Sequence, residues 1–230
     1  RTATKADQWI PIRPGTDAAM IMAMIKIVLD EKLYKEDYVK AHTNLPFLVR
    51  SDNKQVLHCS DIDPNESDGY VVIDESSGLP TAVETSNGSV LEWKGNIRLA
   101  DGSEVECQTG FSALITGCQE FTLSRAEEIT DVPQDVIREL IHEYANADPA
   151  TIWMGQGVQR YYNGHQSFRA MITLGALLGN IGKQHAGVNW AGGTLLRFIL
   201  ATPDSWLAPG GKTGRVFPGT RIHDIIEKAE

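Results

Sequence analysis

Cysteine is scarce in this chain of 230 residues. Only three cysteines occur, Cys59, Cys107 and Cys118, and no two of them form a Cys-x-x-Cys pair. Zinc and iron–sulfur sites are commonly built from such pairs, so the sequence predicts neither kind of metal site. The odd number also argues against a disulfide framework, and small buried or surface thiols are the better interpretation.

Basic residues and long apolar runs are also few. Lysine and arginine number 21 against 30 aspartates and glutamates, which gives a formal net charge of −9. Nucleic-acid binding needs clustered basic side chains, so a nucleic-acid partner is not expected. The only long apolar run, residues 18–29, is too short to cross a bilayer and contains Lys26, so direct membrane insertion is not expected either.

No targeting segment is visible at the start of the chain. The first residue is Arg1 rather than methionine, and the residues after it have no targeting character. We therefore expect the chain to be part of a longer protein. Its cellular location stays open between the bacterial periplasm and the cytoplasm, with membrane association through partner subunits as a further option.

The chain is rich enough in apolar residues to form a buried core. Hydrophobic residues make up 42% of it, and the mean hydropathy is −0.22. Strand patterns at 8–12 and 150–154 alternate with helical patterns at 18–31 and in the region after 124. The 18–31 segment is apolar on nearly every side, as expected for a helix that is buried against a parallel sheet. An α/β fold with a mostly parallel sheet is therefore predicted.

The region between residues 45 and 118 has a different pattern. Short alternating runs are separated by turn signals such as Asn87-Gly88 and Asp101-Gly102, which predicts an inserted β-rich and loop segment. The chain then divides into four parts. Residues 1–44 and 119–190 would form the two halves of one cofactor domain, 45–118 the insertion, and 191–230 a loop-rich segment with a helix over 222–229.

The turn Arg13-Pro14-Gly15-Thr16-Asp17 is the first candidate binding motif. Gly15 allows a ligand to approach the backbone closely, and Asp17 stands at a predicted helix start, where the helix dipole stabilises an anion. A carboxylate at this place can accept two hydrogen bonds from the edge of a guanine. A simple helix N-cap is the competing interpretation, and the motif alone favours it.

The loop from Met154 to Arg160 is the second candidate. It follows a predicted strand, and a helix follows it, so its backbone N–H groups and the helix start would attract phosphate. Arg160 occupies the place of the third glycine of the dinucleotide fingerprint, which counts against an NAD site. The residues expected to bind a cofactor are Met154, Gly155, Gln156, Gly157, Gln159 and Arg160. A tight strand-to-helix connection is an equally good interpretation of the loop alone.

Two asparagines and their neighbouring glycines form the third candidate. Gly179, Asn180 and Gly182 follow a predicted helix, and Asn189 lies a few residues later. Their amides could face a heterocycle, although a helix C-cap followed by a loop is the simpler local interpretation.

Groups that could carry out a reaction are missing from these patterns. The six histidines are dispersed, no Gly-x-Ser-x-Gly occurs, and no nucleophile is paired with a base. We therefore predict no catalytic residue and no metal ligand within the chain. Three ligand-facing loops without a reactive group indicate a domain that holds a cofactor.

The ordered set of motifs resembles the molybdopterin oxidoreductases of the dimethyl sulfoxide reductase family. Four stretches carry the resemblance: 6–17, 126–133, 155–160 with 163–164, and 174–182 with 187–189. It implies a Rossmann-like three-layer domain from the centre of a catalytic subunit. It also implies molybdenum or tungsten bound by two molybdopterin guanine dinucleotides, and two-electron redox or oxo-transfer chemistry, often in anaerobic respiration. Gly15 and Asp17 would meet a guanosine, and the glycine loops would line the cofactor cleft.

The chain departs from the family pattern in what it does not contain. The family's N-terminal iron–sulfur cysteines, the protein ligand of the metal and the C-terminal cofactor domain are all outside it, and Gln184-His185-Ala186 replaces a frequent Pro-Gly turn. We therefore expect the isolated chain to be inactive and to bind no cofactor. Its expected partners are an iron–sulfur electron-transfer protein and the remaining domains of the same subunit.

Two other functions remain open at this point. The chain could be a stand-alone nucleotide-binding domain of the dehydrogenase type, which binding of NAD would reveal. It could also be a non-catalytic scaffold subunit, although that alternative leaves the three glycine-rich turns unexplained.

Overall fold

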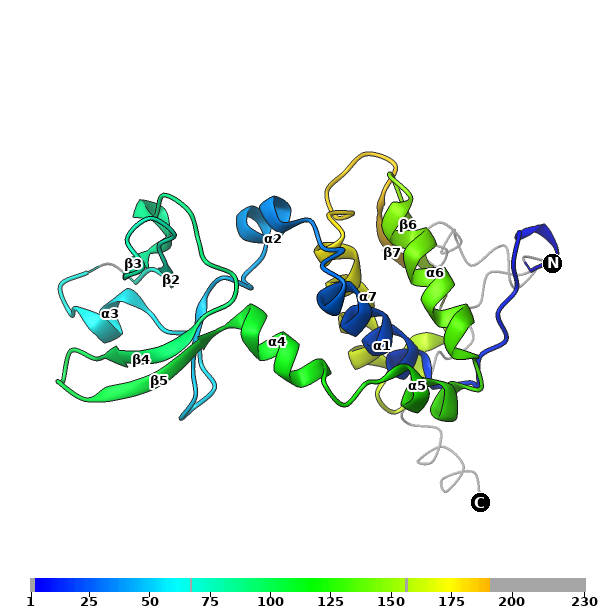
Figure 1. The fold of residues 1–230 in the computed structure, drawn as a ribbon, viewed down its shortest axis with the longest axis horizontal. Helices are drawn as coiled ribbons and strands as arrows, with labels where there is room; N and C mark the ends of the chain where they lie inside the picture. The colour runs from blue at the N-terminus through cyan, green and yellow to red at the C-terminus, as the bar shows by residue number, and fades with distance from the viewer. Residues whose placement is uncertain (1–2, 67, 156, 191–230) are drawn as a thin grey trace, which may run out of the picture. The chain divides into compact units, whose positions relative to one another are not determined.

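A computed structural model describes residues 3–66, 68–155 and 157–190, and Figure 1 shows them as a ribbon. Residues 1–190 belong to one compact unit, which is the part described below. The helix predicted over 222–229 lies outside the described residues. No helix among the described residues is long and apolar enough to cross a membrane.

Helix α1 (Asp17–Asp30) is the centre of the main core. Its alanine, methionine and isoleucine side chains favour a helix and are buried on most sides, with Ile25 and Val28 fully buried. It packs against α7 (Gly164–Leu177), α5 (Leu123–Thr130), α6 (Gln134–Asn146) and α4 (Gly110–Cys118). The prediction of a buried helix at this place is confirmed.

The one parallel pair of strands among the described residues is β6 (Thr151–Met154) with β7 (Gly187–Trp190). Helix α7 connects them, as a parallel pair requires. Met154 is buried in the main core, whereas Trp153 points to the other face of the pair and is 69% exposed. One face of this small sheet is therefore covered and the other is open.

The remaining strand pairs are antiparallel. Strands β1 (Leu48–Arg50), β5 (Glu104–Thr109) and β4 (Lys94–Arg98) form one sheet in that order, and β2 (Val71–Ile73) pairs with β3 (Pro80–Ala82). The prediction of a mixed α/β fold is confirmed, but the mostly parallel sheet is not found among the described residues. The turn at Asp101-Gly102 connects β4 directly to β5, and so short a connection only permits antiparallel pairing.

The strand predicted over residues 8–12 is absent. Pro11 has no N–H to donate to a neighbouring strand, and Trp9 is 70% exposed. The first backbone bond that ties this segment to the core comes from Arg13, whose N–H donates to the carbonyl of Thr130 at 2.9 Å.

The sequence predicts that Asp131 caps the following helix, with Pro133 in its first turn, and the structure shows that this prediction is wrong. Asp131 is the C-cap of α5 in a left-handed conformation, with φ of 62°, and Pro133 occupies the N-cap position of α6. Aspartate tolerates this conformation better than most residues, which explains how α5 can end without a glycine.

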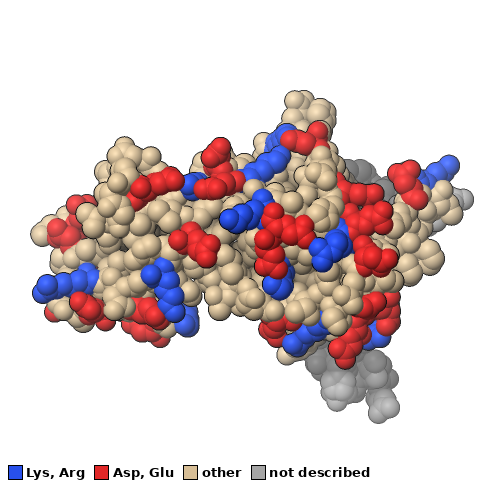
Figure 2. Space-filling view, in the orientation of Figure 1, with Lys and Arg blue, Asp and Glu red and all other residues tan. Residues whose placement is uncertain are grey.

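Residues 48–109 build a second small core of their own around Leu48, Leu57, Ile73 and Cys107. A buried carboxylate, Asp74, organises one of its turns by accepting bonds from the backbone N–H groups of Ser77 and Asn87, each at 2.8 Å. The other short elements are η1 (Ala3–Lys5), α2 (Glu36–His42), α3 (Cys59–Ile62), η2 (Val83–Thr85) and η3 (Val158–Arg160). Figure 2 shows acidic and basic side chains interspersed on the face that it draws.

Candidate functional site

Helices α1 and α7 lie side by side and run in the same direction. At one end Gly15, just before α1, lies against Tyr161, just before α7: a methyl group on Gly15 would be 3.0 Å from Cδ1 of the ring. At the other end the N–H of Lys35, just beyond α1, donates to the carbonyl of Leu177 at 2.9 Å. The amino ends of both helices are therefore at the same edge of the molecule.

The carboxyl ends of β6 and β7 are at this edge as well. Met154 and Trp190 are paired as the last residues of the two strands, and the chain continues from Met154 into the glycine-rich loop. We call this region, where the two strands end and α1 and α7 begin, the carboxyl edge. Open α/β sheets bind ligands at such an edge, because helix amino ends present unpaired N–H groups and a positive dipole there.

The turn before α1 is one half of the candidate site. Gly15 has φ of 82°, which explains why a glycine stands there. Thr16 is the N-cap, but its hydroxyl donates to the carbonyl of Arg13 at 2.6 Å instead of capping the helix. Asp17 is the first residue of α1 and is half-buried, and its carboxylate makes no hydrogen bond or ion pair with any described residue. It is an acceptor available to a ligand.

Arg13 is already engaged. Its Nε donates to Oδ2 of Asp131 at 2.9 Å and its Nη2 to Oδ1 at 2.6 Å, so one edge of the guanidinium is occupied by this carboxylate. Both side chains are more than half exposed. Pro14, the next residue, is exposed in the turn.

The loop after β6 is the other half. Within 4 Å of a methyl group on Gly155 or Gly157 there is no described atom, and neither residue has a positive φ. The fold itself therefore gives no steric reason for glycine at these positions, whereas close approach of a ligand would give one. Met154 is buried, and Gln156 lies outside the described residues.

Two exposed side chains follow the glycines. Gln159 and Arg160 lie on η3, and neither side chain bonds to a described residue. A close contact fixes η3 to the start of α7, since a methyl group on Gly164 would be 2.5 Å from the carbonyl oxygen of Val158. The backbone of Arg160 is thus fixed near the carboxyl edge, and its side-chain donors have no partner among the described residues.

An aromatic hollow of about 400 Å³ adjoins this loop. Trp190 extends the aromatic surface, with its ring centroid 6.1 Å from that of Phe168 in an edge-on contact. Aromatic faces of this kind suit a planar heterocycle. The hollow is lined by Gln159, Tyr161, Tyr162, His165 and Phe168. Apart from Gln159, these residues belong to no motif that the sequence predicts, although the adjacent tyrosines were a visible signal.

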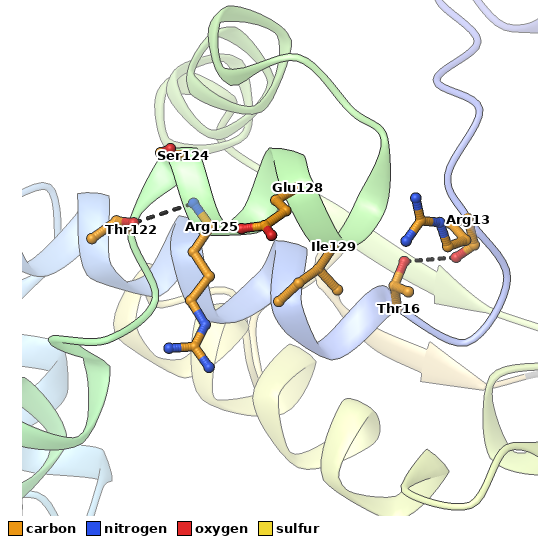
Figure 3. A pocket seen from close by; sticks show the side chains of 7 residues that line it. All are labelled: Arg13, Thr16, Thr122, Ser124, Arg125, Glu128 and Ile129. Carbon is orange, nitrogen blue, oxygen red and sulfur yellow. Dashed lines mark hydrogen bonds between the residues drawn. The ribbon is translucent and has the colours of Figure 1, made fainter.

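A second hollow, of about 700 Å³, lies between the turn before α1 and helix α5. Figure 3 shows Arg13 and Thr16 on one side of it, and on the other Thr122, Ser124, Arg125, Glu128 and Ile129. Arg125 forms an ion pair with Glu120 at 3.2 Å. The hollow contains charges of both signs, so it does not select an anion by charge alone.

The third candidate motif lies at the opposite end of α7. Gly179 and Asn180 donate to the carbonyls of Ala176 and Gly175 at 3.1 and 2.9 Å, which is the Schellman pattern of a helix C-terminus. Helix α7 has 14 residues, so this motif is about 21 Å from the glycine-rich loop. The structure therefore does not bring Gly179, Asn180 and Gly182 together with the first two motifs.

The side chain of Asn180 is buried, and that of Asn189 bonds to the neighbouring strand. Asn180 is 1% exposed, and its Oδ1 has no hydrogen-bond partner among the described residues. Burial raises the pKa of the nearby Tyr144 hydroxyl, and Asn180 works against that shift. The Nδ2 of Asn189 donates to Oγ1 of Thr151 at 2.8 Å, which joins β7 to β6. Ligand contacts by Asn180 and Asn189 stay predictions.

The described residues offer no obvious reactive group. Burial raises the pKa of both Cys107 and Cys118 to about 11, so their thiols stay protonated near neutral pH. Within the described ranges, no three histidine, cysteine, aspartate or glutamate side chains are grouped as a metal site would require. What the carboxyl edge offers is a binding surface: free backbone donors, one free carboxylate, one free guanidinium and aromatic faces.

One family of known proteins matches most of this chain. The model of the molybdopterin oxidoreductase family matches residues 1–212. The chain belongs to this family. Membership implies a molybdenum–molybdopterin cofactor, and the resemblance to the dimethyl sulfoxide reductase family is confirmed.

Three relatives illustrate the match. The alpha subunit of perchlorate reductase from Dechloromonas aromatica is 33% identical, over 82% of this chain and 24% of its own length. The alpha subunit of respiratory nitrate reductase from Haloferax mediterranei is 27% identical, over 98% and 24%. The putative catalytic subunit of dimethyl sulfoxide reductase from Halobacterium salinarum is 29% identical, over 100% and 27%. The chain thus spans about a quarter of the length of these relatives.

Among solved structures, acetylene hydratase from Pelobacter acetylenicus is similar, with a TM-score of 0.48 and 21% identity. That match covers 80% of this chain and 16% of the hydratase.

Proposed function

We propose that this chain is the central cofactor-binding part of an oxidoreductase that holds molybdenum or tungsten on two molybdopterin guanine dinucleotides. The observation that carries the proposal is the convergence of two helix amino ends with the glycine-rich loop at the carboxyl edge, in a chain of the molybdopterin oxidoreductase family. The metal and its pterins would supply two-electron redox chemistry, often with oxygen-atom transfer. The residues of this chain would bind and orient the cofactor.

The described residues fit a guanine dinucleotide. The free carboxylate of Asp17 can accept from the N1–H and exocyclic amine of guanine, and Pro14 and Gly15 would form the turn beneath it. The open space at Gly155 and Gly157 would admit a diphosphate against backbone N–H groups. Arg160 and Gln159 would add donors from η3, and Met154 would support the loop from the core.

The residues at the far end of α7 are too far from the glycine-rich loop to bind the same part of the cofactor. We keep Gly179, Asn180 and Gly182 as proposed contacts of a ligand segment about 21 Å from the glycine-rich loop. Gly182 is the most open of them, because no described atom lies within 4 Å of a methyl group built on it. Asn189 would act near the carboxyl edge, next to Trp190.

The uncovered face of β6 and β7 supports a larger sheet in the whole protein. Trp153 is 69% exposed on that face, and exposing so large an apolar side chain to water is unfavourable. We propose that further parallel strands from the rest of the protein extend this sheet and that a second helical layer covers its open face. The result would be a Rossmann-like three-layer domain to which residues 1–44 and 119–190 contribute, with 45–118 inserted. In the full-length protein, Trp153 would then be shielded from a soluble fluorescence quencher. Full quenching would contradict the three-layer domain.

The remaining parts of the same polypeptide would complete the enzyme. They would supply the metal ligand, the second half of the cofactor site and an iron–sulfur cluster in the N-terminal region. An iron–sulfur electron-transfer subunit is a proposed partner, supported by relatives that are themselves named as alpha subunits.

The metal and cofactor content of the full-length protein tests the proposal. The full-length protein would be purified anaerobically and its metal, pterin and guanine contents measured after acid hydrolysis. We expect one molybdenum or tungsten and two guanines per polypeptide. Protein that is folded and redox-active but contains no pterin would overturn the proposal, and a saturable thermal shift with NAD would favour a dehydrogenase-type domain instead.

A further inference from the structure

Arg13 is fixed to the protein at three points. Its N–H donates to the carbonyl of Thr130 at 2.9 Å, its own carbonyl accepts the hydroxyl of Thr16 at 2.6 Å, and its guanidinium binds both oxygens of Asp131. Figure 3 shows the bond between Thr16 and Arg13 at the start of α1. Two of the five N–H donors of the guanidinium are committed to Asp131, and a phosphate that used the same donors would have to displace this carboxylate.

The other end of the ion pair is equally well anchored. Asp131 follows Thr130, which is fully buried and whose hydroxyl donates to the carbonyl of Ala126 at 2.6 Å. The left-handed conformation of Asp131 ends α5 and turns its carboxylate toward Arg13. The joint between α5 and α6 is thus a firm support for the turn before α1.

We infer that Arg13 acts on the cofactor through Asp131, as half of an ion pair that positions the turn carrying Gly15 and Asp17. This inference rests on the proposed function, because it takes Asp17 to be a cofactor ligand. Arg160 has no partner among the described residues, so all its donors are available to a phosphate. Arg13 and Asp131 are therefore positioning residues.

A double-mutant cycle in the full-length protein separates positioning from direct binding. The variants are Arg13→Gln, Asp131→Asn and the two combined, and the readout is the rate at which the pterin cofactor dissociates. Both side chains are more than half exposed, so the effect of each change is modest. We expect each single variant and the double variant to raise the rate by the same two- to fivefold or so, because all three remove one pair.

Direct phosphate binding by Arg13 gives a different pattern. Arg13→Gln would then raise the rate at least about tenfold while Asp131→Asn left it unchanged, and this result would overturn the inference.

A second arginine pair provides the control for stability. Arg138 donates to Glu31 at 2.6 Å, joins α6 to the end of α1, and is about as exposed as Arg13. Arg138→Gln should lower the thermal midpoint about as much as Arg13→Gln and leave cofactor dissociation unchanged. Equal dissociation rates in these two variants would show a general loss of stability and overturn the positioning role.

Hydrogen exchange distinguishes failure of this inference from failure of the proposed function. In cofactor-free protein, Arg13→Gln and Asp131→Asn should each speed exchange in a peptide covering residues 10–20 by about two- to tenfold. Unchanged exchange would overturn the positioning role even if the protein binds the cofactor. If the unsubstituted protein contains no pterin, the proposed function fails, and this exchange result still tests the ion pair.

Discussion

The ring of Tyr161 lies directly over Gly15, so that a single methyl group added to Gly15 would be 3.0 Å from Cδ1 and 3.2 Å from Cε1 of the ring. The two residues come from opposite ends of the described chain. Their contact joins the turn before α1 to the loop before α7, and it holds the two halves of the candidate site together.

Gly15→Ala should therefore destabilise the protein by about 1–3 kcal/mol. Two effects combine, the strain of φ at 82° and the collision with the ring. Gly102→Ala is the matched control, because Gly102 has φ of 85° and no atom within 4 Å of an added methyl group. Urea denaturation should show a larger loss for Gly15→Ala, and Tyr161→Ala should remove the difference. Equal losses in the two alanine variants would mean that the ring contact contributes nothing.

Gly175→Ala tests the packing of α7 on β7. An added methyl group would be 2.5 Å from Cγ2 of Val188, so overpacking should cost about 1–3 kcal/mol despite the better helix propensity of alanine. Gly117→Ala, on α4 with no atom within 4 Å, should instead be neutral or stabilise by up to about 1 kcal/mol. Thermal unfolding of both variants checks the opposite signs. A neutral Gly175→Ala would show that the two elements can separate without cost.

Local patterns in the sequence were sufficient to predict some of the helices and strands. The apolar run at α1 and the strand before the glycine-rich loop both follow from residue type and spacing, and both are found at Asp17–Asp30 and Thr151–Met154. The prediction of a strand over 8–12 was wrong. Pro11 has no N–H to donate to a neighbouring strand, and the sequence pattern does not show which partner a strand will find.

Contacts between distant residues could not be read from the sequence. The pairing of Arg13 with Asp131 depends on how α5 packs beside α1, and Asp131 looked like a cap for the next helix. Gly179 and Asn180 looked like neighbours of the glycine-rich loop, but the length of α7 separates them. Tyr161 belongs to none of the motifs that the sequence predicts. A linear pattern gives local conformation, whereas a binding site depends on which helix ends the packing brings together.

Gly157→Ala should separate folding from cofactor binding. No described atom is within 4 Å of the added methyl group and φ is −59°, so the unfolding free energy should change by less than about 0.5 kcal/mol. A methyl group in the path of a diphosphate should still lower the pterin content of the full-length protein. Gly117→Ala serves again as the control and should retain full pterin content. Unchanged pterin in Gly157→Ala would remove this glycine from the site.

Asp74 should make the protein sensitive to acid. Hydrogen bonds from Ser76, Asn87 and Ser77 hold the pKa of this carboxyl far below its usual range. A lowered folded-state pKa stabilises the protein above the unfolded value of about 3.9, and this contribution is lost as the pH falls below it. Asp74→Asn should lower the thermal midpoint at pH 7 by several degrees, and the difference from the unsubstituted protein should shrink toward pH 2.

Asp101 offers a comparison for this effect, since it accepts bonds from Ser103 alone, at 2.8 and 2.6 Å. Asp101→Asn should therefore lower the midpoint less than Asp74→Asn does. A constant difference between pH 7 and pH 2 for Asp74→Asn would show that its carboxylate does not stabilise the fold through ionisation.

Asp17→Asn addresses the proposed guanine contact itself. The substitution keeps the size of the side chain and removes one acceptor and the charge, so two guanine donors no longer meet a carboxylate. We expect the affinity for one dinucleotide to fall by about 1–3 kcal/mol, seen as a loss of about half the guanine in the purified full-length protein. The helix dipole alone predicts a smaller loss of stability, about 0.3–1 kcal/mol. Asp135→Asn, in the first turn of α6, should show that stability loss and no loss of guanine. Equal guanine contents in the two variants would mean that Asp17 stabilises helix α1 and does not bind guanine.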